Sequence, residues 1–207
     1  MRRIALMGGS FNPIHCGHMN LARAALENAL ADEVLFLPTG NPPHKRDGLA
    51  DKNDRFAMVE LALKGEARMK ASREEVDRQG VIYTVDTLTR LHEAMPDAAL
   101  YYLIGADTLL QLHTWRQPEK VIRLCTFLLA MRPGESGQEV ERQLAFWREK
   151  GADIVLLDAQ QMDISSTELR EKIRCGQSLE GLVPAAVEAY IREHGLYGSG
   201  EDQANET

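Results

Sequence analysis

The sequence predicts an α/β protein with a doubly wound, mostly parallel sheet. Short β-rich runs alternate with longer segments of helical periodicity, a pattern typical of helices packed on both faces of a parallel sheet. Of the 207 residues, 44% are hydrophobic and 27% are charged, which is typical of a globular chain with a buried core. We therefore expect one domain over residues 1–197, followed by a disordered tail at 198–207 that is rich in Gly, Asp, Glu and Asn.

The individual elements follow from the spacing of apolar residues. The chain opens with a β-α-β unit, in which strands at Ile4–Met7 and Val34–Leu37 flank a helical pattern at Leu21–Leu30. Further strands are expected at Arg68–Ser72, Leu100–Ile104, Phe127–Met131 and Ile154–Leu157. The helical patterns that accompany them lie at Asp54–Leu63, Thr84–Glu93, Pro118–Leu124 and Gln138–Lys150. Two more helices, Thr167–Cys175 and Pro184–Glu193, have no strand between them, so we expect a small C-terminal helical appendage.

Charge, cysteine content and the length of apolar runs exclude several classes of protein. The formal net charge is −7, which argues against a surface that coats nucleic acid. Cys16, Cys125 and Cys175 form no C-x-x-C pair, which indicates a reducing cytoplasm without disulfides or structural zinc. Gly8 and Gly9 end the first apolar run far short of a membrane span or an export signal. We therefore expect a cytoplasmic protein with neither nucleic acid nor membrane as partner, and the sequence leaves a homo-oligomer open.

In doubly wound sheets ligands bind beyond the carboxyl ends of the strands, so chemistry is expected in the loops that follow them. The first such loop reads Gly8-Gly9-Ser10-Phe11-Asn12-Pro13-Ile14-His15-Cys16-Gly17-His18. Glycines let a backbone approach a ligand closely, and the helix that begins near His15 offers unpaired N–H groups and the positive end of its dipole. His15 and His18 are three residues apart at that helix start, which lets both ring N–H groups face one anion.

This first string is neither a dinucleotide fingerprint nor a P-loop, and it points to a nucleotidyltransferase. A plain turn with capping histidines is the alternative. Metal ligation by the two histidines is weakly indicated, because no carboxylate stands nearby in the sequence.

A basic loop follows the second strand and reads Asn41-Pro42-Pro43-His44-Lys45. The prolines stiffen the loop, and His44 and Lys45 present cations toward the crevice. A phosphate-binding loop and a solvated turn are both consistent with this pattern. Arg55, at the start of the next helical pattern, is similarly open between a phosphate contact and a surface ion pair.

Two further segments adjoin amphipathic helices. Tyr83-Thr84-Val85-Asp86-Thr87 precedes a helix that Thr84 is suited to cap. Gly105-Ala106-Asp107 follows the most apolar strand, and Trp115 comes shortly after it. Taken singly, these residues fit caps and core as well as they fit a ligand pocket.

A late helix opens with the string Ile164-Ser165-Ser166-Thr167-Glu168-Leu169-Arg170. Ser165 and Glu168 fit the S-x-x-E capping box. The same helix start exposes N–H groups, and Arg170 adds a bidentate phosphate donor. A cap and a phosphate site are equally consistent with this string alone.

Together these motifs, in this order between Arg3 and Tyr197, resemble the bacterial nicotinate-nucleotide adenylyltransferases (NadD family) of the H-x-G-H nucleotidylyltransferase superfamily. That family often has Asp at the position of Asn12. The resemblance implies a Rossmann-like nucleotidylyltransferase fold. It also implies an enzyme of NAD biosynthesis that transfers the adenylyl group of ATP to nicotinate mononucleotide, giving nicotinate adenine dinucleotide and pyrophosphate.

The resemblance also implies roles for individual residues. It makes His15, His18, Lys45 and Arg170 catalytic. The ATP-binding residues it implies are Gly8, Gly9, Ser10, Phe11, His15, His18, Gly105, Asp107, Ile164, Ser165, Ser166 and Arg170. Those implied for nicotinate mononucleotide are Asn12, His44, Lys45, Tyr83, Thr84 and Trp115. Mg²⁺ is expected to enter with ATP, held by phosphate oxygens and water, and no residue is assigned as a metal ligand.

Three other functions remain open at this point. An adenylyltransferase for phosphopantetheine is disfavoured, because those enzymes typically lack the Pro-Pro-His-Lys and Tyr-Thr-x-Asp-Thr strings. One for nicotinamide mononucleotide is harder to exclude, since a carboxylate site made of backbone amides leaves little trace in the side chains. A non-catalytic nucleotide-sensing module is disfavoured by the presence of both histidines together with Lys45 and Arg170.

Overall fold

Six parallel strands form one sheet in the computed structural model, which describes residues 1–28, 30–40, 48–131, 137–159 and 162–198. The strands are β1 (Arg2–Gly9), β2 (Glu33–Pro38), β3 (Met69–Ala71), β4 (Ala98–Gly105), β5 (Thr126–Ala130) and β6 (Ile154–Leu157). Their order is β3-β2-β1-β4-β5-β6, and all neighbours are parallel. This is the order of a doubly wound sheet, so the predicted fold class is confirmed.

The register brings the carboxyl ends of the central strands to one edge of the sheet. Gly9 at the end of β1 pairs with Pro38 at the end of β2. Gly105 at the end of β4 pairs with Ala130 at the end of β5. The winding direction changes between β1 and β4, and a crevice at this switch point is where such sheets bind ligands.

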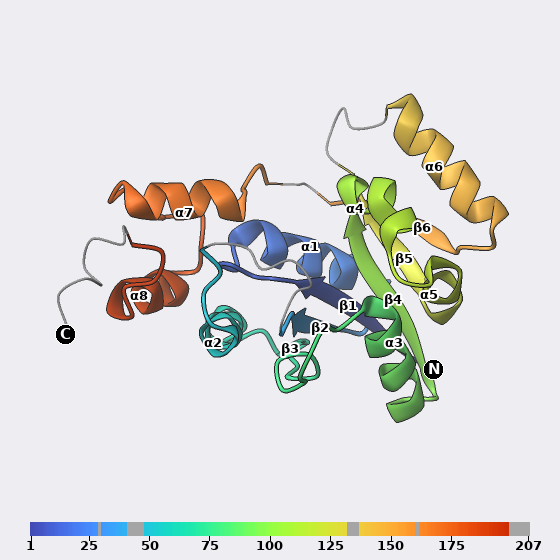
Figure 1. The fold of residues 1–207 in the computed structure, drawn as a ribbon, viewed down its shortest axis with the longest axis horizontal. Helices are drawn as coiled ribbons and strands as arrows, with labels where there is room; N and C mark the ends of the chain where they lie inside the picture. Colours follow the sequence, from blue (N-terminus) through green and yellow to red (C-terminus); the bar gives the residue numbers. More distant parts are fainter. Residues whose placement is uncertain (29, 41–47, 132–136, 160–161, 199–207) are drawn as a thin grey trace.

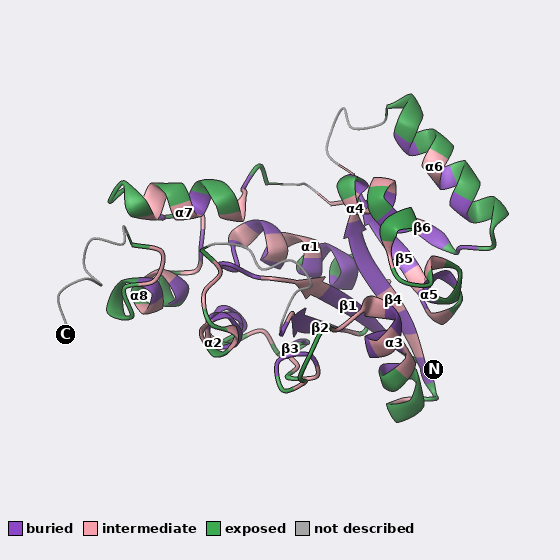
Figure 2. Cartoon of the chain, viewed as in Figure 1, coloured by how far each residue is buried: buried purple, intermediate pink, exposed green. Residues whose placement is uncertain are grey.

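Helices cover both faces of the sheet (Figure 1). They are α1 (Cys16–Glu27), α2 (Lys52–Ala62), α3 (Thr84–Ala94), α4 (Ala106–Gln111), the 3₁₀ helix η1 (Leu112–Thr114), α5 (Pro118–Leu124), α6 (Gln138–Glu149), α7 (Ser166–Arg174) and α8 (Ala185–Glu193). Successive strand residues point to opposite faces, which creates two cores. Ala5 and Met7 pack with α1, α2, α7 and α8, whereas Ile4 and Leu6 pack with α3, α4, α5 and α6. Figure 2 shows the strands between these layers as largely buried.

The C-terminal helices form the expected appendage at one end of the molecule (Figure 1). α8 packs against α2, and Leu169 of α7 and Val187 of α8 are buried in the same core as α1. Tail residues 199–207 lie outside the described part of the chain. Within the described residues, no helix is long and apolar enough to cross a membrane.

Most expected elements are present, with shifts of a few residues at their ends. The largest difference is at α1, which was expected at Leu21–Leu30 and spans Cys16–Glu27, and β1 extends two residues beyond its expected bounds at each end. α4 and η1 were not expected from the sequence. Together they span only 106–114, which is too short for helical periodicity to stand out.

Candidate active site

The loop between β1 and α1 is built around the buried ring of Phe11. Phe11 is 1% exposed and has a φ of +46°, in the left-handed region that non-glycine residues seldom adopt. Its ring centroid lies 5.0 Å from that of His18, edge to face, and 5.7 Å from that of Phe36 in β2. The strained conformation thus places an apolar support directly against His18.

His15 and His18 lie together at the start of α1. Their rings stack with centroids 3.7 Å apart and planes 28° apart. A Cβ atom on Gly17 would lie 3.0 Å from Nδ1 of His15, closer than normal contact. The glycine in the His-x-Gly-His string therefore makes room for the first imidazole.

The local hydrogen bonds and burial set the protonation of this pair. Nδ1 of His18 accepts a hydrogen bond from the backbone N–H of His15 at 3.2 Å, so neutral His18 carries its proton on Nε2. Burial lowers the pKa of His15 to about 4. Burial, and to a smaller extent the neighbouring His15, hold the pKa of His18 well below its usual range. Both rings are therefore neutral hydrogen-bond donors at pH 7.

A cavity of about 160 Å³ lies beside His18 at the switch point of the sheet. Three of the residues that line it, Gly8, His18 and Gly105, belong to the set that the sequence assigned to ATP. The others, which that set did not include, are Met7, Leu21, Leu103, Ile104, Thr108 and Ala130. A concave, mostly apolar pocket with a few polar groups is typical of small-molecule sites.

The start of α7 contacts the β1–α1 loop across the molecule. The Ser166 hydroxyl donates to the carbonyl oxygen of Pro13 at 3.1 Å. Nη1 of Arg170 donates to the carbonyl oxygens of Asn12 at 2.9 Å and of Ser166 at 3.1 Å. The structure therefore brings the first and last sequence motifs together.

The other members of the last motif have structural contacts. Ser165 caps α7 by accepting a hydrogen bond from the N–H of Thr167 at 3.3 Å, and not from the N–H of Glu168 as in the predicted capping box. Ile164 is only 9% exposed and belongs to the core beside α1. Their contacts with a nucleotide remain predictions.

Asn12 joins the β1–α1 loop to the segment before α2. Its Nδ2 donates to the carbonyl oxygen of Gly48 at 2.9 Å, and its Oδ1 accepts from the N–H of Ala50 at 3.0 Å. The side chain is 5% exposed. Both ends of the amide thus have a protein partner, and the contact with nicotinate mononucleotide assigned to Asn12 remains a prediction.

The Tyr83 and Trp115 segments meet on the opposite face of the sheet. The Arg116 guanidinium carbon lies 4.7 Å from the centre of the Tyr83 ring, a cation–π distance. The Trp115 ring meets the Tyr102 ring edge to face at 5.9 Å. Within the described residues, Arg116 has no ion pair with a carboxylate. The Arg116 cation, which has no carboxylate partner among the described residues, therefore lies over the Tyr83 ring.

Several sequence assignments change once these positions are known. Tyr83 is the cap residue of α3 and Thr84 is its first helical residue, so Thr84 does not cap the helix as expected. Asp107 is exposed in the first turn of α4. His44 and Lys45 lie outside the described residues. Arg55 is 1% exposed and binds backbone carbonyls, so it fits neither a surface ion pair nor a free phosphate contact.

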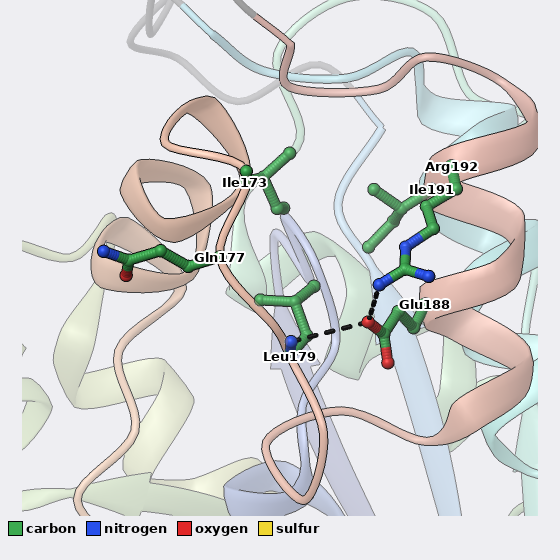
Figure 3. Close-up of a pocket in the computed structure, with 7 residues that line it drawn as sticks. Ile173, Gln177, Leu179, Glu188, Ile191 and Arg192 are labelled. Atoms are coloured by element: carbon green, nitrogen blue, oxygen red, sulfur yellow. Dashed lines mark hydrogen bonds and ion pairs between the residues drawn. The ribbon is translucent and has the colours of Figure 1, made fainter.

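A larger cavity, of about 250 Å³, lies away from these motifs between α7 and α8 (Figure 3). Its carboxylate, Glu188, already accepts hydrogen bonds from the N–H of Leu179 at 3.4 Å and from Nη2 of Arg192 at 2.6 Å (Figure 3). Ile173 and Ile191 supply apolar walls. With its acid paired and none of the predicted residues in its lining, it is a poor candidate for the reaction.

Comparisons with known proteins identify the family and the fold of the chain. Residues 6–172 match the cytidylyltransferase-like family. The chain is 41% identical over 200 residues to the probable nicotinate-nucleotide adenylyltransferase of Neisseria meningitidis serogroup B, covering 95% of this chain and 99% of that protein. It is 43% identical over 199 residues to the protein of the same description from Synechococcus, covering 95% of each.

A solved structure extends the similarity to the fold. The nicotinic acid mononucleotide adenylyltransferase of Plasmodium falciparum, complexed with NaAD, superposes with a TM-score of 0.80 at 18% identity, over 95% of this chain and 98% of that one. Because of this similarity to its sequence relatives and the match to the family model, we conclude that the chain belongs to the nicotinate-nucleotide adenylyltransferase family, within the cytidylyltransferase-like proteins.

Proposed function

We propose that this protein is a nucleotidyltransferase that transfers the adenylyl group of ATP to nicotinate mononucleotide, giving nicotinate adenine dinucleotide and pyrophosphate in NAD biosynthesis. The observation that carries the proposal is the cavity at the switch point, where Gly8, His18 and Gly105 meet beside a helix start. Relatives that are 41% and 43% identical and are described as this enzyme support the choice of reaction.

The chemistry needs placement more than it needs an acid or a base. The phosphate of the mononucleotide is already anionic near pH 7, so one of its oxygens attacks the α-phosphorus of ATP directly. A P–O bond forms there as the P–O bond to pyrophosphate breaks, and pyrophosphate leaves with the electron pair. The protein contributes by aligning two anions and by stabilising the charge that moves onto the departing group.

The neutral His15 and His18 pair suits this task. Nε2 of His18 carries the ring proton, and the side chain lines the cavity. We therefore assign this N–H as the donor to the α-phosphate. Neutral rings keep the free site from holding a tightly bound anion, and an arriving triphosphate raises their pKa values. The charge on the pair therefore follows the substrate.

The remaining proposed contacts follow the sequence motifs. Ser166 and Arg170 are assigned to the β- and γ-phosphates from the start of α7, with Lys45 as a further phosphate contact. Within the described residues, no group of three His, Cys, Asp or Glu side chains is placed to hold a metal ion. Mg²⁺ is assigned to the substrate, MgATP, where phosphate oxygens and water hold it.

Arg116 supports nicotinate mononucleotide, and not nicotinamide mononucleotide, as the acceptor. In the proposed complex the pyridine ring packs near Tyr83, Thr84 and Trp115. Arg116 lies on the Tyr83 ring without a carboxylate partner in the described part of the chain. A cation at that position favours the nicotinate carboxylate over the neutral nicotinamide group.

The decisive experiment measures pyrophosphate release with MgATP and three acceptors in parallel: nicotinate mononucleotide, nicotinamide mononucleotide and phosphopantetheine. We expect turnover with the nicotinate substrate and a fall in kcat of about 10²–10³-fold in His18→Ala, the usual effect of losing one transition-state donor. His92→Ala, which changes an exposed histidine of α3, is the matched control. Near-normal turnover in His18→Ala would refute the assigned role. Preference for another acceptor would move the specificity, and ATP binding without turnover would favour a sensing module.

A further inference from the structure

Arg55 stands at the meeting point of three backbone segments. It is the fourth residue of α2 and is 1% exposed. Nη1 donates to the carbonyl oxygen of Ser10 at 2.7 Å, and Nη2 donates to those of Thr39 at 2.7 Å and Gly40 at 3.0 Å. Nε donates to the carbonyl oxygen of Ala50 at 3.0 Å. One guanidinium group therefore connects the end of β1, the end of β2 and the start of α2.

These contacts are unusual because the buried charge has no carboxylate partner. Within the described residues, Arg55 forms no ion pair, and its burial lowers its pKa. Burying a charged side chain is costly, and packed apolar residues often serve stability equally well. Only the fork of an arginine reaches several carbonyl oxygens in one plane at once. The geometry therefore favours a role in placing the backbone.

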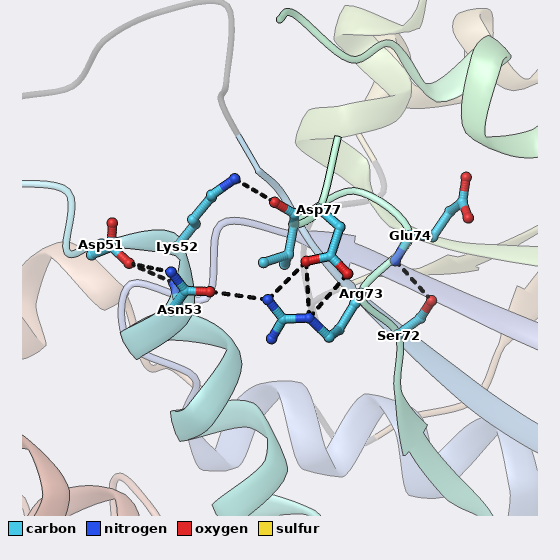
Figure 4. Close-up of polar contacts among 8 residues, drawn as sticks. Asp51, Lys52, Asn53, Ser72, Arg73, Glu74 and Asp77 are labelled. Carbon is cyan, nitrogen blue, oxygen red and sulfur yellow. Dashed lines mark hydrogen bonds and ion pairs between the residues drawn. The ribbon is translucent and has the colours of Figure 1, made fainter. Parts of the chain in front are cut away.

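The helix that carries Arg55 is anchored independently of it (Figure 4). Asp51 caps α2 by accepting from the N–H of Asn53 at 2.8 Å. Nζ of Lys52 donates to the carbonyl oxygen of Val76 at 2.5 Å, and Arg73 bonds to Asn53 and Asp77. The core residue Met58 holds the same helix from its inner face. Loss of the Arg55 guanidinium is therefore expected to leave α2 in place and to release chiefly the two strand ends.

The two strand ends belong to different halves of the proposed site. Ser10 is part of the loop that leads to His15 and His18. Thr39 and Gly40 follow β2 and directly precede, in the sequence, the loop with His44 and Lys45, which are assigned to nicotinate mononucleotide. The Ser10 carbonyl and the Thr39 carbonyl are held by neighbouring nitrogens of one planar group. Their separation is thus fixed by covalent geometry instead of by loop packing alone.

We propose that Arg55 is a positioning residue for adenylyl transfer, which holds the backbone after β1 against the backbone after β2 so that donor and acceptor phosphates keep the alignment that in-line attack requires. The proposal rests on the proposed function. Misplacement of about 1 Å far from the chemistry costs about 100-fold in rate. We therefore expect Arg55→Lys, which keeps the charge but loses the fork, to lower kcat about 10- to 100-fold with a smaller change in KM.

A chemical rescue separates positioning from folding. In Arg55→Ala, added methylguanidine should raise kcat with saturation, whereas methylammonium, with the same charge and no fork, should not. Met58→Ala is the control for stability, because it removes a fully buried side chain from the same helix without touching either strand end. It should lower the midpoint of urea unfolding while kcat stays at the wild-type value.

Hydrogen exchange gives a readout that does not depend on turnover. In Arg55→Lys, the backbone amides of residues 10–12 and 39–40 should exchange faster than in the wild type. In Met58→Ala, the same amides should show no such local increase in exchange rate. The proposal would be overturned if Arg55→Lys had the kcat and the amide exchange rates of the wild type. It would also be overturned if Arg55 and Met58 variants of equal stability lost kcat to the same extent. If the wild-type protein releases no pyrophosphate, the proposed function fails, and the exchange result still decides whether Arg55 places the two strand ends.

Discussion

Gly8 offers a direct test of how closely the site is packed. A Cβ atom at this position would lie 2.1 Å from the Tyr102 hydroxyl oxygen and 3.1 Å from Cζ of the same ring. Ordinary contact begins near 3.4 Å, so Gly8→Ala requires the oxygen or the strand to move by 3.4 − 2.1 = 1.3 Å. Tyr102 is 9% exposed and is held by the Trp115 and Phe127 rings at 5.9 and 6.5 Å. It has little freedom to yield.

Overpacking of this kind lowers the free energy of unfolding by about 1–3 kcal/mol. In Gly8→Ala we expect a loss in that range, together with weaker ATP binding, because Gly8 lines the cavity beside His18. Tyr102→Phe removes the obstructing oxygen and leaves Cζ, at 3.1 Å, as the nearest of the atoms that the methyl group would meet. Only about 0.3 Å of movement is then needed, 3.4 − 3.1, and the cost of Gly8→Ala should fall by about 1–2 kcal/mol in that background.

Urea unfolding of the four proteins in this double-mutant cycle, with calorimetric titration of ATP, makes the measurement. Tyr102→Phe alone should change the free energy of unfolding by about 1 kcal/mol or less, because it removes one hydroxyl group and keeps the ring. Gly105→Ala is the control glycine, because it lines the same cavity and its Cβ would meet no atom within 4 Å. If Gly8→Ala costs the same with Tyr or Phe at 102, the hydroxyl is not the obstacle and the packing argument is wrong.

Protonation, loop anchoring and substrate choice give three further expectations. Burial lowers the pKa of His15 from 6.5 to about 4, so between these pH values the unfolded state binds more protons than the folded state. The free energy of unfolding should therefore fall by about 3 kcal/mol as the pH drops from 6.5 to 4. Urea unfolding of His15→Asn should show a smaller fall. Asn12→Asp keeps the acceptor and removes the donor, and should cost about 1 kcal/mol in unfolding free energy, against about 2–3 kcal/mol for Asn12→Ala; equal losses would contradict the two-bond anchor. Arg116→Gln should lower the nicotinate-to-nicotinamide ratio of kcat/KM about fivefold, the effect of roughly 1 kcal/mol, while the exposed Arg123→Gln leaves it unchanged.

The strands and most helices could be predicted from the sequence because each has a local pattern of apolar and boundary residues. Apolar runs such as Val34–Leu37 are bounded by turn residues, and helices such as Pro118–Leu124 begin with a residue suited to the first turn. α4 was missed because six residues are too few for periodicity to appear.

The site was predictable to the extent that its residues form contiguous strings. The His15 and His18 pair follows from its spacing within one helix start. Arg55 contacts Ser10, which is 45 positions away in the sequence, and the residues next to Arg55 in the sequence do not indicate that its partners are backbone carbonyl groups. Tyr102 likewise looks like an ordinary strand residue until the fold places its hydroxyl against Gly8. Such roles depend on register between strands and require the structure.

The pairing of the site arginines also affects how substrates reach the protein. The chain carries a net charge of −7, which repels two anionic substrates at a distance. Arg55 and Arg170 neutralise no carboxylate among the described residues, because their partners are backbone carbonyl and threonine hydroxyl oxygens. Their positive charge therefore adds to the potential around the β1–α1 loop, which both side chains contact. Such a field draws anions toward one edge of an otherwise acidic molecule, and the association rate should fall as ionic strength shortens its reach.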